Sequence, residues 1–121
     1  AVKLAKSVYN LDIFCGTFDQ FKPQKQFDVI CMYQTLEHVP NPDFIIDRSY
    51  ELLKKDGILV IEVPNIKAFD IKIDNERKRL SYDLPRHLNH FHPSFLSKEI
   101  KKRKFEILDI DLHYPSFILK L

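Results

Sequence analysis

Two continuous apolar segments on either side of one helix limit the fold more than any other feature of this chain. The first, residues 27–33, reads FDVICMY, and the second, residues 58–64, reads ILVIEVP. Each is apolar on both alternating faces apart from one acidic residue, which is typical of parallel strands covered by helices on both sides. A strand, a helix and a strand with short connections form a right-handed βαβ unit. The sequence therefore predicts an α/β fold.

The helix between these strands has favourable residues at its start. Asn41 is a good capping residue, Pro42 suits the first turn because its missing N–H is no loss there, and Asp43 favours the positive end of the helix dipole. At the other end, Gly57 is expected to supply a left-handed stop. The helix is thus predicted to begin at Asn41–Pro42 and to end before Gly57.

Other elements follow from shorter patterns. LDIFCGTF, residues 11–18, is an apolar run that ends in Gly-Thr, and it predicts a strand. Residues 93 onward predict a helix whose inward side chains are Phe95, Leu96 and Ile100. Residues 105–114 alternate and predict a strand near an edge of the sheet. The long charged connection, residues 65–92, is expected to be a lid or a binding segment.

Composition excludes several function classes. The chain has 121 residues, which is enough for one domain. Its 19 basic and 17 acidic residues give a net charge of only +2, so the charge does not indicate a nucleic acid as a partner. No apolar run approaches the roughly 18 residues of a membrane span, so no membrane partner is expected. Cys15 and Cys31 lie in apolar runs and are predicted to be buried free thiols of a cytoplasmic protein.

Candidate binding residues follow the predicted strands. In open α/β sheets, ligands bind beyond the carboxyl ends of the strands, which here are Gly16–Thr17, Tyr33–His38 and Pro64–Asn65. Gly16 either lets the backbone approach a ligand closely or only turns the chain. The pattern does not decide between these two roles.

Glu37 and His38 have three interpretations. His38 is suited to general base chemistry because the pKa of imidazole lies near neutral pH. The pair could instead join His87, His90 and His92 around a metal, or could simply form hydrogen bonds in a loop. The spacing of the three later histidines matches no standard zinc pattern, so we predict no metal.

Together these segments resemble a known family. FDVICMYQTLEHVPNP, a capped helix ending in LLKKDG, and ILVIEVPN resemble the class I S-adenosylmethionine-dependent methyltransferases, and especially the branch of ubiquinone-biosynthesis O-methyltransferases and other small-molecule methyltransferases. RHLNHFHPSFL is similar to a later segment of that branch. The resemblance implies a Rossmann-like sheet, mostly parallel with an antiparallel edge strand. It also implies methyl transfer from S-adenosylmethionine to an oxygen or nitrogen of a small molecule, such as a saccharide or a quinone precursor.

The resemblance also implies roles for individual residues. Gly16, Thr17 and Phe18 would contact the adenine of the cofactor. Tyr33 and Gln34 would border its ribose and methionine portion, and Glu37 would also contact the cofactor. His38 would be the catalytic base at the reaction mouth. The acceptor side would be formed by His87, Asn89 and His90.

One departure from the family limits these expectations. The family's glycine-rich loop and the acidic residue that holds the ribose have no counterpart, because no glycine precedes Gly16. The resemblance therefore implies a single partial domain, residues 1–121, with its N-terminal part missing and with weak or absent cofactor binding. The alternative is a non-catalytic, methyltransferase-like interaction module. Without the family's first strand, the strand 27–33 would have an open apolar edge, so we expect a homodimer through that edge or a longer polypeptide.

Overall fold

The computed structural model describes residues 2–66, 83–112 and 116–120, which form a mixed four-stranded sheet with helices on one face. The strand order is β1-β2-β4-β3, where β1 is Phe27–Tyr33, β2 Leu53–Glu62, β3 Glu106–Asp111 and β4 Ser116–Lys120. β1 and β2 are parallel, as the βαβ prediction requires. β4 runs antiparallel to both of its neighbours, so the antiparallel strand lies inside the sheet and not at its edge.

Helix α2, Pro42–Leu52, connects β1 to β2 and begins as predicted. The side chain of Asn41 accepts a hydrogen bond from the backbone N–H of Phe44. The end of α2 differs from the prediction, because the helix stops at Leu52 and Gly57 lies within β2 without a positive φ. Gly57 is needed for space, since an added Cβ would lie 2.8 Å from the carbonyl oxygen of Lys54.

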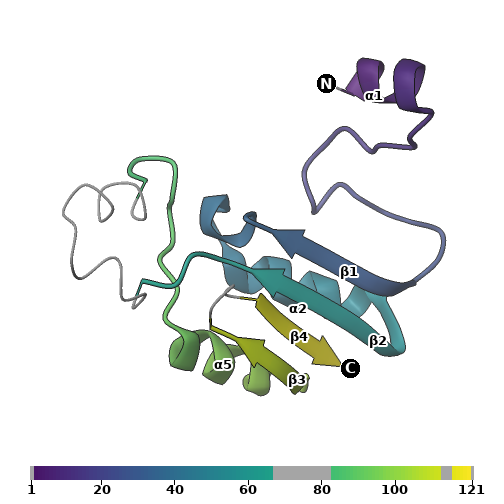
Figure 1. Ribbon diagram of the computed structural model, residues 1–121. Helices are drawn as coiled ribbons and strands as arrows, with labels where there is room; N and C mark the ends of the chain where they lie inside the picture. Colours follow the sequence, from purple (N-terminus) through teal and green to yellow (C-terminus); the bar gives the residue numbers. More distant parts are fainter. Residues whose placement is uncertain (1, 67–82, 113–115, 121) are drawn as a thin grey trace.

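The core lies between the sheet and helices α2 and α5, the latter spanning Pro93–Lys102 (Figure 1). Alternate β2 positions are fully buried, among them Leu59 and Ile61, and they share one apolar cluster with Leu96 and Ile100 of α5. Phe95 was predicted to face inward, but it is 58% exposed. Leu96 and Ile100 form the buried face of the helix instead.

The opposite face of the sheet is open within the described residues. Val29, Cys31 and Tyr33 of β1 lie on that face and are all exposed. The apolar pattern of β1 predicted cover on both faces, whereas α2 and α5 pack against only one. Cys15 and Cys31, predicted to be buried, are both exposed. β1 is also at the edge of the described sheet, as predicted.

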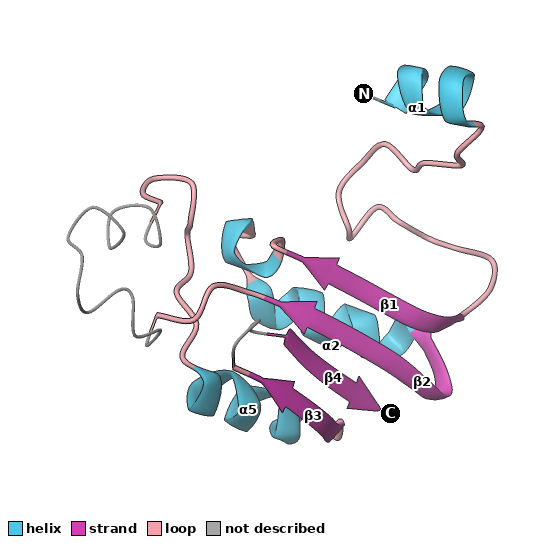
Figure 2. Ribbon diagram, in the orientation of Figure 1, coloured by secondary structure: helices cyan, strands magenta, loops and turns pink. Residues whose placement is uncertain are grey.

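The N-terminal segment lies apart from the sheet. Helix α1, Val2–Tyr9, has no buried residue, and Figure 2 shows it and the following loop standing away from β1. Residues 11–18 form no strand, which corrects the prediction, because no described strand offers them backbone hydrogen bonds. Most of the connection 65–92 lies outside the described residues. None of the described helices is long and apolar enough to span a membrane.

Candidate functional site

The candidate site lies at the carboxyl ends of β1 and β2. β1 leads into a short 3-10 helix, Leu36–His38, through Gln34, which has a φ of 47°. The backbone N–H of Gln34 donates to the carbonyl of Glu62 at 3.0 Å, and its side-chain amide donates to the Glu62 carboxylate at 3.0 Å. These bonds hold the ends of the two parallel strands together and set the direction of the chain toward Glu37 and His38.

The segment before α5 crosses this strand end. The backbone N–H groups of Leu88 and Asn89 both donate to the carbonyl oxygen of Glu37, at 2.8 and 3.0 Å. The Asn89 side chain donates to the carbonyl of Val39 at 2.6 Å. Two residues predicted for the acceptor side, His87 and Asn89, therefore lie beside the predicted reaction mouth.

Glu37 is a buried carboxylate without a hydrogen-bond donor. The residue is 1% exposed, and neither carboxylate oxygen has a hydrogen-bond partner among the described residues. Nε2 of His38 lies 3.8 Å from Oε1. Most buried polar atoms in proteins are hydrogen-bonded, so an exception of this kind calls for a physical explanation.

His38 is held in one tautomer. Its Nδ1 lies 3.0 Å from the carbonyl oxygen of Arg86, and because a carbonyl can only accept, Nδ1 carries the proton. In the neutral ring, Nε2 then has the lone pair. The side chain is 41% exposed, so a ligand in solvent can reach the ring. These properties suit the predicted role of a general base.

His87 completes a cluster with these two residues. Its ring lies edge-on to that of His38 with a centroid distance of 4.8 Å, and the ring of His90 lies 6.3 Å from that of His87. Glu37, His38 and His87 each offer one ligand atom, and these atoms all lie within 4.8 Å of one another. The sequence showed each residue but not this cluster, because His87 is far from Glu37 and His38 along the chain.

Asp83 and Arg86 surround the cluster. Nε2 of His87 lies 3.6 Å from the Asp83 carboxylate, which also pairs with Arg86 at 2.7 Å. The hydrogen bond from Arg86 is the main reason that the pKa of Asp83 lies below its ordinary value. Asp83 is therefore a charged group, and sequence reasoning did not assign it a place at the site.

The predicted adenine contacts lie in the loop before β1. Gly16, Thr17 and Phe18 line a hollow of about 350 Å³, together with Phe14 and Phe21. The N–H of Thr17 donates to the side chain of Gln20 at 3.1 Å. Within the described residues, no hydrogen bond joins this turn to the end of β1, where Tyr33 and Gln34 lie.

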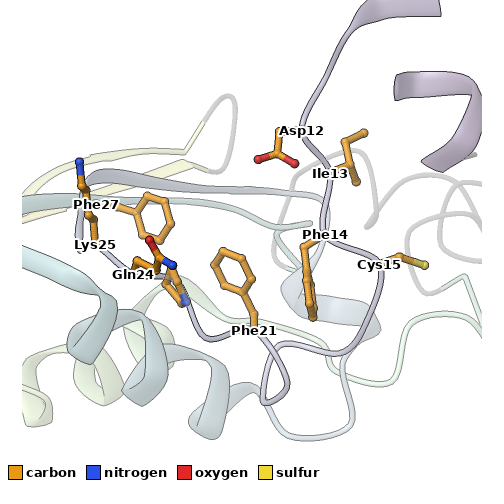
Figure 3. Close-up of a pocket in the computed structure, with 9 residues that line it drawn as sticks. Asp12, Ile13, Phe14, Cys15, Phe21, Gln24, Lys25 and Phe27 are labelled. Atoms are coloured by element: carbon orange, nitrogen blue, oxygen red, sulfur yellow. The ribbon is translucent and has the colours of Figure 1, made fainter. Parts of the chain in front are cut away.

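A larger hollow of about 680 Å³ adjoins this turn. It has an aromatic wall, with ring centroids 5.1 Å apart for Phe14 and Phe21 and 6.0 Å apart for Phe21 and Phe27, and Figure 3 shows these rings beside Asp12 and Lys25. It lies along the loop before β1, and its lining does not include Glu37 or His38.

Tyr33 ends β1 with an exposed ring. The hydrogen bond and the charge of Cys31, two positions earlier on the same face, raise the pKa of Tyr33 above its ordinary value. Thr35 Oγ1 donates to the backbone carbonyl of Tyr33 at 2.8 Å. Tyr33 lies on the open face of the sheet, with Val29 and Cys31.

Comparison with known proteins gives a consistent result. The model of a methyltransferase-domain family matches residues 2–110. A ubiquinone biosynthesis O-methyltransferase of Glaesserella parasuis is 36% identical over 92 residues, which cover 71% of this chain and 39% of that protein. The enzyme of the same name from Pelagibacter ubique is 38% identical over 60 residues, 50% of this chain and 25% of that protein. The chain thus aligns with less than half the length of these relatives.

Solved structures share the fold. A Thermotoga maritima SAM-dependent methyltransferase, described as a possible histamine N-methyltransferase, superposes with a TM-score of 0.66 and 20% identity over 98% of this chain and 63% of that one. The magnesium protoporphyrin IX methyltransferase of Synechocystis, solved with bound SAH, gives a TM-score of 0.64 with 15% identity over 98% and 56%. At these identities the likeness establishes the Rossmann-like fold.

Proposed function

The chain belongs to the class I S-adenosylmethionine-dependent methyltransferases, and we propose that it carries the acceptor side of a site that methylates an oxygen or nitrogen of a small molecule. The observation that supports this proposal best is the cluster of Glu37, His38 and His87 at the carboxyl ends of β1 and β2. That position is where open α/β sheets bind their ligands.

The residues present fit part of the family's cofactor, S-adenosylmethionine. The hollow beside Gly16 has aromatic walls suited to an adenine ring, and an added Cβ on Gly16 would come within 2.7 Å of the Phe14 ring and would displace that ring. Tyr33 and Gln34 would border the ribose and methionine portion. When bound, the cofactor supplies an electrophilic methyl group on a sulfonium.

The chain's own residues would then position the acceptor and take its proton. Positioning two reactants can supply about 7–11 kcal/mol in favourable cases. His38 Nε2 would accept the proton, because Nδ1–H is held by the carbonyl of Arg86. The Glu37 carboxylate, 3.8 Å away, would stabilise the imidazolium that forms. Asn89 and His90 would line the acceptor side.

We further propose that the chain acts within a longer polypeptide, and that alone it binds the cofactor weakly or not at all. The open edge and uncovered face of β1 support this, as does the 39% coverage of the Glaesserella relative. A homodimer through the β1 edge would cover the same surface. The alternative function is a non-catalytic, methyltransferase-like interaction module. A cytoplasmic location stays a prediction.

Calorimetry and a methyl-transfer assay test these points separately. Titration of the 121-residue chain with S-adenosylmethionine should give no micromolar binding, and such binding would refute the partial-domain proposal. In a polypeptide that includes the upstream coding sequence, transfer from labelled cofactor to hydroxyl and amine acceptors should fall by about 10²–10⁴ in His38→Asn. His92→Asn is the matched control, because His92 caps α5 and Asn is also a good cap. Unchanged transfer in His38→Asn would contradict the base role, and no transfer to any acceptor would favour the interaction module.

A further inference from the structure

We propose that Glu62 is a positioning residue for methyl transfer, because its side chain holds Gln34 in the backbone conformation that leads the chain from β1 toward His38. The catalytic consequence rests on the proposed function. The structural part does not, because it concerns contacts within the chain itself. No role followed from the sequence for Glu62, the one acidic residue in the apolar run of residues 58–64.

The position of Glu62 in β2 is unusual for an acidic residue. Ile58, Val60 and Glu62 are half-buried and alternate with buried residues, so these three side chains share the open face of the sheet. Glutamate is depleted in strands, where β-branched residues such as the other two are favoured. Glu62 ends β2 and is the register partner of Tyr33, which ends β1. A carboxylate therefore lies at the carboxyl ends of two adjacent parallel strands, where sheets of this class bind their ligands.

Gln34 has an unfavourable backbone conformation at the same place. Its φ of 47° lies in the left-handed region, which brings Cβ too close to the following carbonyl oxygen. Glycine, and at times asparagine or aspartate, adopts this conformation readily, whereas other residues need compensating contacts. At Gln34 the chain leaves β1 and turns toward the 3-10 helix Leu36–His38. The direction of this turn thus depends on what holds Gln34.

Glu62 holds Gln34 by two hydrogen bonds. The backbone N–H of Gln34 donates to the carbonyl oxygen of Glu62 at 3.0 Å, and its side-chain amide donates to the carboxylate at 3.0 Å. A residue of any type at position 62 could accept the first bond, but the second needs a side chain with an acceptor oxygen. The second bond also has a charged acceptor, and such bonds are stronger than those between neutral groups. The side chain of Glu62 therefore decides how firmly Gln34 is held.

The segment before α5 depends on the ends of both strands. After β1, the carbonyl of Glu37 accepts hydrogen bonds from the N–H groups of Leu88 and Asn89 at 2.8 and 3.0 Å. After β2, Asn65 and Phe91 form an isolated parallel bridge. A contact that fixes the two strand ends relative to each other therefore also fixes the segment that is bound to both of them.

A shift of these segments would affect both reactants of the proposed reaction. Tyr33 and Gln34 would border the cofactor, and His87 and Asn89 would line the acceptor side. A misplacement of about 1 Å can lower a rate about 100-fold, because the reacting atoms must lie close together and aligned. Glu62 acts through Gln34 in this proposal, so it is a positioning residue and not a catalytic one.

Hydrogen exchange followed by NMR tests the structural part in the 121-residue chain, without cofactor. Glu62→Val removes the carboxylate and introduces a residue that suits a strand. Exchange at the amides of Leu88 and Asn89 should become at least about 10-fold faster, while exchange at Leu59 in the core should not change. Glu62→Gln retains an acceptor oxygen, so its exchange rates should stay within about threefold. Glu106→Val, the same change at the start of β3, is the matched control and should alter none of these rates.

A double variant separates positioning from a general loss of stability. Glycine adopts a positive φ readily, so a chain with Gln34→Gly no longer needs the side chain of Glu62. Exchange at Leu88 and Asn89 in Gln34→Gly/Glu62→Val should therefore equal that in Gln34→Gly alone. An equal increase by Glu62→Val in both backgrounds would overturn the inference. Faster exchange at Leu59 by the same factor would also overturn it, because the whole fold would then be less stable.

Kinetics test the catalytic consequence in a polypeptide that includes the upstream coding sequence. Glu62→Val should lower kcat/KM by about 10–100-fold and raise KM for S-adenosylmethionine, while Glu62→Gln and Glu106→Val should stay within about threefold. Unchanged kcat/KM in Glu62→Val, or a lower kcat at unchanged KM as from less folded protein, would contradict the inference. If exchange does not respond but transfer still needs His38, the inference fails and the proposed function stands. If exchange responds as expected and no acceptor is methylated, the positioning by Glu62 stands and the proposed function fails.

Discussion

Replacing Glu37 by glutamine should stabilise the folded chain. Most substitutions of a fully buried residue destabilise a protein, so an increase in the free energy of unfolding is a discriminating result. The reason is that the Glu37 carboxylate is 1% exposed and neither oxygen has a hydrogen-bond donor. Glutamine keeps the shape of the side chain and removes its charge.

The magnitude follows from the burial of the group. An unsatisfied buried polar group costs about 1–3 kcal/mol, and a charged one costs more. The neutral amide is also buried and recovers only part of that cost. We therefore expect Glu37→Gln to raise the free energy of unfolding by about 1–3 kcal/mol. For a domain of this size, each kcal/mol corresponds to a rise in Tm of about 4 °C.

The assay is urea and thermal unfolding followed by circular dichroism, at pH 8 in EDTA, where imidazoles are ordinarily neutral. Glu51→Gln is the control, since the Glu51 carboxylate is 62% exposed and pairs with Arg48 on the surface. Its effect should stay within about 0.5 kcal/mol.

A loss of stability of 1 kcal/mol or more in Glu37→Gln, measured in EDTA, would refute this reasoning. It would mean that the carboxylate has a favourable partner in the folded chain, most simply a protonated His38.

Three further predictions concern the framework around the site. Ile61→Ala should cost about 2–5 kcal/mol in urea unfolding because Ile61 is 0% exposed, whereas Val60→Ala on the open face should cost less. The pKa of Glu99 is lowered mainly by the hydrogen bond from Lys102. The ionised Glu99 therefore stabilises the fold above the unfolded pKa, and this stabilisation is lost as pH falls through the folded pKa. Below pH 4.5, the urea midpoint of unfolding should thus fall less steeply with pH in Glu99→Gln than in the unmutated chain. Val29→Lys should reduce self-association of the chain in sedimentation, because a lysine on an edge strand opposes pairing with another chain. A parent chain that sediments as a monomer and melts cooperatively would contradict the edge proposal.

Elements set by contacts near in sequence could be predicted. The Asn41 cap, the start of α2 at Pro42 and the parallel pairing of β1 with β2 are all as predicted. A capping bond joins residues three positions apart, and a βαβ unit needs only an apolar strand, a helix and a second strand in succession. The edge strand β3 was likewise predicted from its alternating pattern.

Elements that depend on a distant partner could not be predicted in the same way. Residues 11–18 have the composition of a strand, but a strand forms only where a neighbour accepts and donates its backbone hydrogen bonds, and none of the described strands does so. Cys31 was expected to be buried because β1 is apolar on both faces. Its exposure depends on which segments cover the sheet, which the composition of β1 does not determine.

The sequence by itself determined the family, the α/β class, and the presence of an acid and an imidazole directly after the strand β1. These follow from residue type and local spacing. Only the tertiary structure decided that Glu37 is buried without a donor and that His87 lies against His38. Both depend on the segment before α5 crossing the end of β1, where backbone hydrogen bonds to the Glu37 carbonyl hold it. Contacts between such distant segments arise from packing, and packing leaves no periodicity in the sequence from which they could be predicted.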